Sequence, residues 1–150
     1  MAKKLKGKKK QLDYYKEIPK TKKEAIAKAE RYLANAKETI NTKTSIEHER
    51  YKNAKYVSEA SGMAYLAAVI AIKGYLLETE IVKNKYDLPK RYDQYTFCIR
   101  KIPRNGKLMD HFNTVYENLH VAGYYEGFCN VNFIKGGFES ARKIIDMLSA

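Results

Sequence analysis

The sequence has no tryptophan, only three prolines and two cysteines, and no long uninterrupted hydrophobic run. Cys98 and Cys129 are too few for a disulfide framework and do not form a zinc-binding pattern, so we expect two free thiols and a cytoplasmic location. No apolar stretch follows the basic start of the chain, which excludes a secretory signal. The uncharged stretch 62–72 has eleven residues, whereas a membrane span needs about 20. We therefore expect a buried helix there and no membrane span.

Proline is so scarce that it leaves long stretches free to form helices. Each of its three positions, 19, 89 and 103, lies where a helix is expected to start or break. Apolar residues recur at steps of three and four along most of the chain, which is the period of an amphipathic helix. No stretch alternates apolar and polar residues with β-branched enrichment, so no sheet is expected. The predicted helices cover about 22–41, 45–84, 90–102, 107–125 and 134–148.

The predicted fold class is all-α, an antiparallel four- to five-helix bundle with one long central helix, because short connections make neighbouring helices antiparallel. Thr21 and Glu24 form a capping box before the first helix. Thr44 and Glu47 repeat this pattern and are expected to open the long one. At 150 residues the chain suits a single domain with its own core.

The net charge of +12 is concentrated at the start of the chain, because residues 1–23 carry ten lysines against two acidic residues. Like charges repel and this segment has little to bury, so we expect residues 1–20 to be a basic, largely disordered arm before a helical domain at 21–150. Such an arm favours RNA, DNA or another polyanion through counterion release; the alternative is a solubilising tail. The lysines expected to contact nucleic acid there are Lys8, Lys9 and Lys10.

A ridge of small residues lies in the middle of the long predicted helix, at steps of four and three, where it lets a neighbouring helix approach closely. A helix that is apolar on most sides is normally the centre of a bundle or a subunit interface. One functional hypothesis is therefore a non-catalytic dimerisation or protein-interaction module. The residues of the ridge are Ala60, Ala64, Ala67, Ala71 and Gly74.

The other hypothesis rests on Arg104 and His111, on either side of the expected start of the helix 107–125. A helix N-terminus attracts phosphate, and histidine titrates near neutral pH. Lys101 and Lys107 add positive charge nearby. Such a pair can support RNA cleavage without a metal, because the imidazole moves a proton while the guanidinium stabilises phosphoryl charge. The alternative is a surface arginine and a histidine bonded to a neighbouring group.

A metal site is not expected. Glu117 and His120 match the Glu-x-x-His element of di-iron bundles, but such a site needs a second copy of the element. The chain contains no second copy. We predict no metal and no cofactor.

With these features the chain resembles the HEPN domains, a family of helical bundles that bind nucleotides or RNA. Arg104, with the polar Asn105 next to it and six residues between Arg104 and His111, is similar to the ribonuclease motif of that family. The likeness also includes segments 31–37, 64–68 and 137–142.

This resemblance implies a homodimer in which the motifs of both subunits meet in one cleft. Active members cleave RNA without metal, often as toxins or defence factors, and a nucleotidyltransferase-type antitoxin is then the implied partner. In that case Arg104 would hold phosphate, His111 would act as the acid and base, and Asn105 would orient either one. Many other members are non-catalytic and bind nucleotides or partner nucleotidyltransferases.

Overall fold

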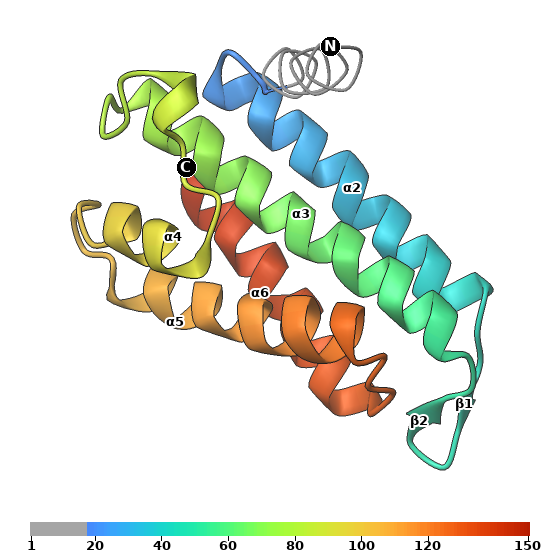
Figure 1. Ribbon diagram of the computed structural model, residues 1–150. Helices are drawn as coiled ribbons and strands as arrows, with labels where there is room; N and C mark the ends of the chain where they lie inside the picture. The colour runs from blue at the N-terminus through green and yellow to red at the C-terminus, as the bar shows by residue number, and fades with distance from the viewer. Residues whose placement is uncertain (1–17) are drawn as a thin grey trace, which may run out of the picture.

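The structure is a computed structural model that describes residues 18–150, so the predicted arm, including Lys8, Lys9 and Lys10, lies almost wholly outside the described residues. The described part is a helical bundle with one very small sheet (Figure 1). The predicted all-α bundle with a long central helix is therefore confirmed. The elements in chain order are α2 (Lys22–Thr42), β1 (Ile46–Glu47), β2 (Arg50–Tyr51), α3 (Ala54–Glu78), η1 (Lys85–Asp87), α4 (Tyr92–Ile99), α5 (Gly106–Thr114), η2 (Val115–Tyr125) and α6 (Val131–Ser149).

Helix α2 begins at the predicted capping box. The Thr21 hydroxyl accepts a hydrogen bond from the Glu24 amide at 3.1 Å, and the Glu24 carboxylate accepts one from the Lys20 amide at 3.2 Å. These bonds satisfy amides that have no partner within the helix. The apolar stripe of α2 is buried along α3, which runs beside it in Figure 1. Its buried residues are Ala25, Ala29, Leu33, Ala36 and Ile40.

The ridge of small residues on α3 is buried inside the single chain. A Cβ added at Gly74 would lie 2.2 Å from the Cβ of Ala25, so α2 and α3 touch there with almost no side chain between them. The four alanines of the ridge have no exposed surface. The ridge is therefore used within the bundle and is not available to a second chain.

By length and composition alone, α3 could cross a membrane, but more than half of its most apolar window is buried in the bundle. This burial agrees with the expectation of a core helix in a soluble protein.

The predicted helix 45–84 is wrong at both ends. Its first residues form a hairpin, in which Ile46 pairs with Tyr51 and Glu47 with Arg50, so the prediction of no sheet is also wrong. Two turn residues, His48 and Glu49, have φ angles of 51° and 62°, a left-handed conformation that no helix allows.

Long-range hydrogen bonds hold this hairpin in place. The Tyr51 amide donates to the Cys129 carbonyl at 2.9 Å, and the Val131 amide donates to the Glu49 carbonyl at 3.0 Å. The predicted cap at Thr44 instead closes the hairpin, because its hydroxyl accepts from the Asn53 amide at 3.1 Å. The helix then starts at Ala54.

At its other end α3 stops at Glu78, because Glu80 takes a left-handed φ of 57°. The Glu80 amide donates to the Leu77 carbonyl at 3.2 Å, which is one of the two bonds of a Schellman motif, and the Val82 amide bonds back to the Leu76 carbonyl at 3.1 Å.

The second half of the bundle is close to the prediction. Helix α4 is shorter than the predicted 90–102, because the Gln94 side chain caps its start by accepting from the Lys90 and Arg91 amides. Helices α5 and η2 are continuous, and η2 has the wider turns of a π-helix. At Gly123, η2 lies so close to α3 that an added Cβ would be 2.2 Å from the Ser61 hydroxyl oxygen.

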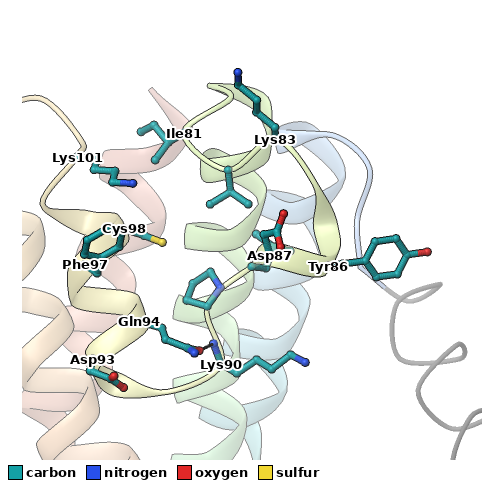
Figure 2. Close-up of a pocket in the computed structure, with 13 residues that line it drawn as sticks. Ile81, Lys83, Tyr86, Asp87, Lys90, Asp93, Gln94, Phe97, Cys98 and Lys101 are labelled. Carbon is teal, nitrogen blue, oxygen red and sulfur yellow. Dashed lines mark hydrogen bonds between the residues drawn. The ribbon is translucent and has the colours of Figure 1, made fainter.

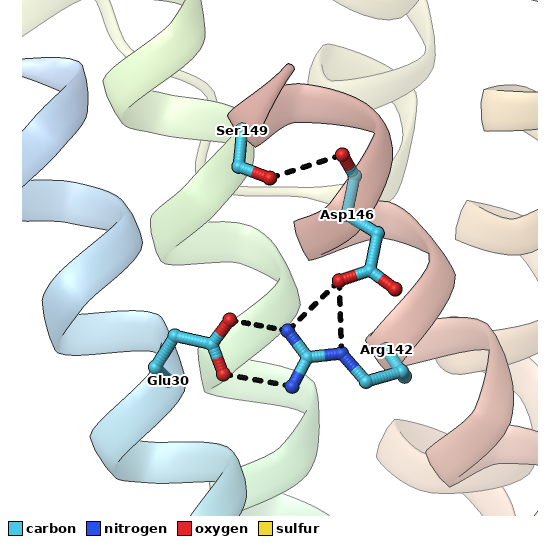
Figure 3. A network of polar contacts seen from close by, with 4 residues as sticks. All are labelled: Glu30, Arg142, Asp146 and Ser149. Carbon is cyan, nitrogen blue, oxygen red and sulfur yellow. Dashed lines mark hydrogen bonds and ion pairs between the residues drawn. The ribbon is translucent and has the colours of Figure 1, made fainter.

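Helix α6 closes the bundle against α2, α3 and η2. Its Arg142 donates to both carboxylate oxygens of Glu30 on α2, and it also donates to Asp146 one turn further along α6 (Figure 3). This pairing lowers the pKa of the Glu30 carboxyl and raises that of the guanidinium. The first and last described helices are therefore linked by charge as well as by packing.

Candidate functional site

Two of the three predicted catalytic residues, Arg104 and Asn105, lie in the turn between α4 and α5. Arg104 is exposed, and its φ of 57° gives it a left-handed backbone. Asn105 turns its side-chain amide back to the end of α4, where it donates to the Arg100 carbonyl at 3.0 Å and to the Ile102 carbonyl at 2.9 Å. The side-chain amide of Asn105 therefore caps the end of α4, and Asn105 is also the N-cap residue of α5, without a side-chain bond to that helix.

His111 lies on the second turn of α5, in a different environment. Its Nδ1 atom is 3.1 Å from the hydroxyl oxygen of Ser140, a buried residue of α6. The imidazole is half-buried at the α5–α6 contact. Among the residues described, no hydrogen bond or ion pair connects it to Arg104 or Asn105.

Positive charge is concentrated at this turn. Between Asp93 and Asp110 the chain has four basic residues and no acidic one. All four are exposed, and none has an ion pair within residues 18–150. Unpaired cations held together raise the local potential and attract anions. We call these residues the basic turn: Arg100, Lys101, Arg104 and Lys107.

A cavity of about 790 Å³ lies beside the basic turn, between α4 and the connection that follows α3 (Figure 2). Phe97 lines it with 59% of its surface exposed, which is unusual for a phenylalanine. The Lys101 ammonium lies 4.3 Å from the centre of the Phe97 ring. Lys101 is thus the one predicted residue in the lining, while Arg104, Asn105, Lys107 and His111 lie outside it.

The rest of the lining mixes both signs of charge. Lys83 and Lys90 contribute cations, and Asp87 and Asp93 contribute carboxylates. Asp93 is engaged by Arg91 at 3.5 Å. The cavity can therefore offer an aromatic face, ammonium groups and hydrogen-bond acceptors to one ligand.

Cys98 also lines this cavity, but it is a poor nucleophile. Only 8% of the residue is exposed, and burial raises the pKa of its thiol despite the nearby Lys101. The thiol therefore stays protonated near neutral pH, and a protonated thiol does not attack.

The sequence analysis missed Phe97. The apolar stripe of α4 passes through Tyr95 and Ile99 and leaves Phe97 on the other face, four residues before Lys101. An aromatic residue off the buried stripe with a lysine one turn later is the signal that could have found it.

In the described chain, no three histidine, cysteine or acidic side chains come together as they do around a metal. His120, the histidine of the Glu-x-x-His element, stacks on Tyr65 with 4.4 Å between ring centres. Burial lowers the pKa of this imidazole.

Comparison with known proteins gives a family and a structural neighbour. Residues 24–150 match the family model described as a domain of unknown function, DUF5618. A solved structure of a protein of unknown function from Dyadobacter fermentans is similar, with 31% sequence identity and a TM-score of 0.72. The similarity covers 85% of this chain and 96% of that chain. Among curated proteins there is no match.

Proposed function

We propose that this chain, which belongs to the DUF5618 family, binds single-stranded RNA or a nucleotide in the cytoplasm through the basic turn and the cavity beside it. The observation that carries this proposal is the exposed ring of Phe97 with the Lys101 ammonium 4.3 Å from its centre. A base can stack on any exposed aromatic face, whereas its phosphate needs a cation nearby. This pair offers both within one helical turn.

The charge around Phe97 supports the same ligand. Arg100, Arg104 and Lys107 extend the positive surface from Lys101 across the turn to the start of α5. Phosphates placed along them would release counterions, which drives nucleic-acid binding. Stacking supplies about 1–3 kcal/mol for each base.

Fluorescence anisotropy with a labelled single-stranded RNA tests this proposal. We expect Phe97→Ala to weaken binding about tenfold, because it removes one stacked base worth about 1.4 kcal/mol. Lys101→Ala is expected to weaken binding less and to reduce its dependence on salt. Both residues are exposed, so the fold is expected to survive.

A matched pair of residues on α3 provides the control. The Lys55 ammonium lies 5.4 Å from the ring of Tyr56, far along the chain from the basic turn. Lys55→Ala and Tyr56→Ala are expected to leave RNA binding unchanged. Equal losses in the two pairs would mean that binding follows overall charge and aromatic content, and this would contradict the proposal.

A second candidate function, metal-independent RNA cleavage, has one specific observation in its favour. Ser140 engages Nδ1 of His111, and a bond to one ring nitrogen fixes the tautomer and orientation of the other. An imidazole held in this way is prepared to transfer protons through Nε2. Arg104 would stabilise the phosphoryl charge. In this second proposal the protein is a homodimer of toxin or defence type with a nucleotidyltransferase-type antitoxin.

Incubation with labelled RNA in EDTA separates binding from cleavage. Cleavage that is lost in both His111→Ala and Arg104→Gly, with binding retained in the former, would support the enzyme. Salt-sensitive RNA binding without any cleavage would support the binding function and contradict the enzymatic one.

A further inference from the structure

A second cavity, of about 340 Å³, lies on a different part of the bundle, between α2, α6 and strand β2. Its floor is apolar, made by side chains that are almost wholly buried: Ile40, Tyr51 and Phe138 are 5–7% exposed. Cavities that bind small molecules have volumes from about 300 Å³ upward and mostly apolar linings with a few polar groups. This cavity is at the lower end of that range.

The rim of this cavity carries an excess of positive charge. Lys37 comes from α2, and Lys135 and Lys143 come from α6. None of the three has an ion pair within residues 18–150. Glu139 is the one acidic residue of the lining, and it lies one helical turn from each of the two α6 lysines.

Arg142 also lines this cavity, but its charge is already used. Glu30 and Asp146 together hold the guanidinium (Figure 3), and neither of them lines the cavity. The three lysines therefore carry the charge that remains for a ligand. Against the single carboxylate of Glu139 they leave a charge of two within the lining. The two carboxylates that share Arg142 reduce this excess to one for the cavity and its immediate surroundings.

We propose that this cavity binds a small amphipathic anion, with an apolar or aromatic body on the floor and a carboxylate, sulfonate or phosphate group at the three lysines. The floor excludes water from one side of the ligand, which strengthens its attraction to the lysines. Tyr51 adds an aromatic ring, and burial raises the pKa of its hydroxyl, so that this hydroxyl remains a hydrogen-bond donor. The inference goes beyond the RNA-binding proposal and does not depend on it.

Two fluorescent probes with the same body test this proposal on the full chain. 1-Anilinonaphthalene-8-sulfonate carries an anionic group, whereas N-phenyl-1-naphthylamine lacks it. We expect saturable one-to-one binding of the anionic probe and at least tenfold weaker binding in the triple variant Lys37→Ala, Lys135→Ala, Lys143→Ala. The neutral probe is expected to bind weakly and equally to both proteins.

A control triple variant, Lys20→Ala, Lys23→Ala, Lys55→Ala, lowers the net charge by the same amount away from this cavity and from the basic turn. It is expected to bind the anionic probe like the unmodified chain. An equal loss in both triple variants would show only bulk attraction, and equal binding of both probes would show only an apolar surface. Either result overturns the proposal. Phe97→Ala is predicted to weaken RNA binding and to leave binding of the anionic probe unchanged. The RNA-binding proposal and this one can therefore be refuted independently.

Discussion

The backbone at Arg104 has a φ of 57°, a left-handed conformation that costs a residue with a Cβ about 1–2 kcal/mol. Glycine avoids this cost but adds about 0.4–1 kcal/mol of entropy to the unfolded chain. We therefore expect Arg104→Gly to leave the free energy of unfolding unchanged or to raise it by about 1 kcal/mol at most. Urea denaturation measures this difference.

Arg100→Gly is the matched control, because Arg100 has an ordinary helical φ of −59°. It removes the same charge from the same turn but is expected to lower stability, since glycine disfavours a helical backbone. If Arg104→Gly lowered stability as much as Arg100→Gly, the Arg104 guanidinium would have a structural role. A loss of RNA cleavage in Arg104→Gly would then no longer report on contact with phosphate.

Glu30 has a lower pKa in the folded chain, because Arg142 donates hydrogen bonds to its carboxylate. Protonation of Glu30 therefore favours unfolding. Its stabilising contribution is fully present above the ordinary pKa of 4.5 and is lost as the pH falls through the lower folded value. The Glu30 side chain is 46% exposed, so solvent screening limits this contribution to about 0.5–1 kcal/mol.

Glu30→Gln is expected to lower the free energy of unfolding by that amount at pH 7 and to have no effect near pH 2. Urea denaturation at the two pH values measures both quantities. Glu38→Gln on the same helix is the control, because Glu38 has no ion pair within the described chain. A loss from Glu30→Gln that stayed the same at both pH values would trace to packing rather than to the carboxylate charge.

At the scale of elements, the close approach of α2 and α3 depends on Gly74. An added methyl group there would lie 2.2 Å from the Cβ of Ala25, and two backbones in contact cannot easily move apart. We expect Gly74→Ala to destabilise the chain by about 1–3 kcal/mol. Adding Ala25→Gly is expected to recover most of this loss, although it introduces a new helical glycine.

Gly136, in α6, is the matched control. The nearest atom to an added methyl group there is 3.7 Å away, which is an ordinary contact. Gly136→Ala is expected to be neutral or to stabilise the helix by up to about 1 kcal/mol. Thermal unfolding of the unmodified chain, Gly74→Ala, Ala25→Gly and the double variant gives the coupling between positions 25 and 74. Simple additivity of the two single changes would refute the contact.

The helices could be predicted from the sequence because their apolar stripes recur with a fixed period, but the hairpin at 46–51 could not. Neither His48 nor Glu49 is one of the glycine, asparagine or aspartate residues that signal a tight left-handed turn, so the sequence contains little local sign of the turn that they make. Bonds from Glu49 and Tyr51 to the distant segment 129–131 hold it instead. Contacts of that range leave no mark in a local pattern.

At the scale of the whole molecule, the sequence indicated where charge gathers but not which surfaces remain open. The basic turn could be predicted from four basic residues in one short acid-free segment. The cavity beside it could not, because the connection after α3 forms its other wall. In the same way, the alanines of α3 suggested an interface, and only the folded chain shows that they are already buried inside the bundle.

The charge of the whole chain gives the last prediction, on the salt dependence of RNA binding. For single strands, the slope of log K against log salt falls by about 0.7 for each phosphate contact. The full-chain variant Lys8→Gln, Lys9→Gln, Lys10→Gln lowers the net charge from +12 to +9. If all three lysines contact phosphate, the magnitude of this slope is expected to fall by about 2.

Phe97→Ala is expected to do the opposite, lowering affinity while leaving the slope unchanged, because stacking releases no counterions. Anisotropy titrations at four salt concentrations separate the two effects. An unchanged slope in the lysine variant would mean that the arm makes no phosphate contact and that the basic turn supplies the electrostatic attraction by itself. A changed slope in Phe97→Ala would mean that the ring positions cations rather than bases, and stacking would then have to be abandoned as the reason why Phe97 is exposed.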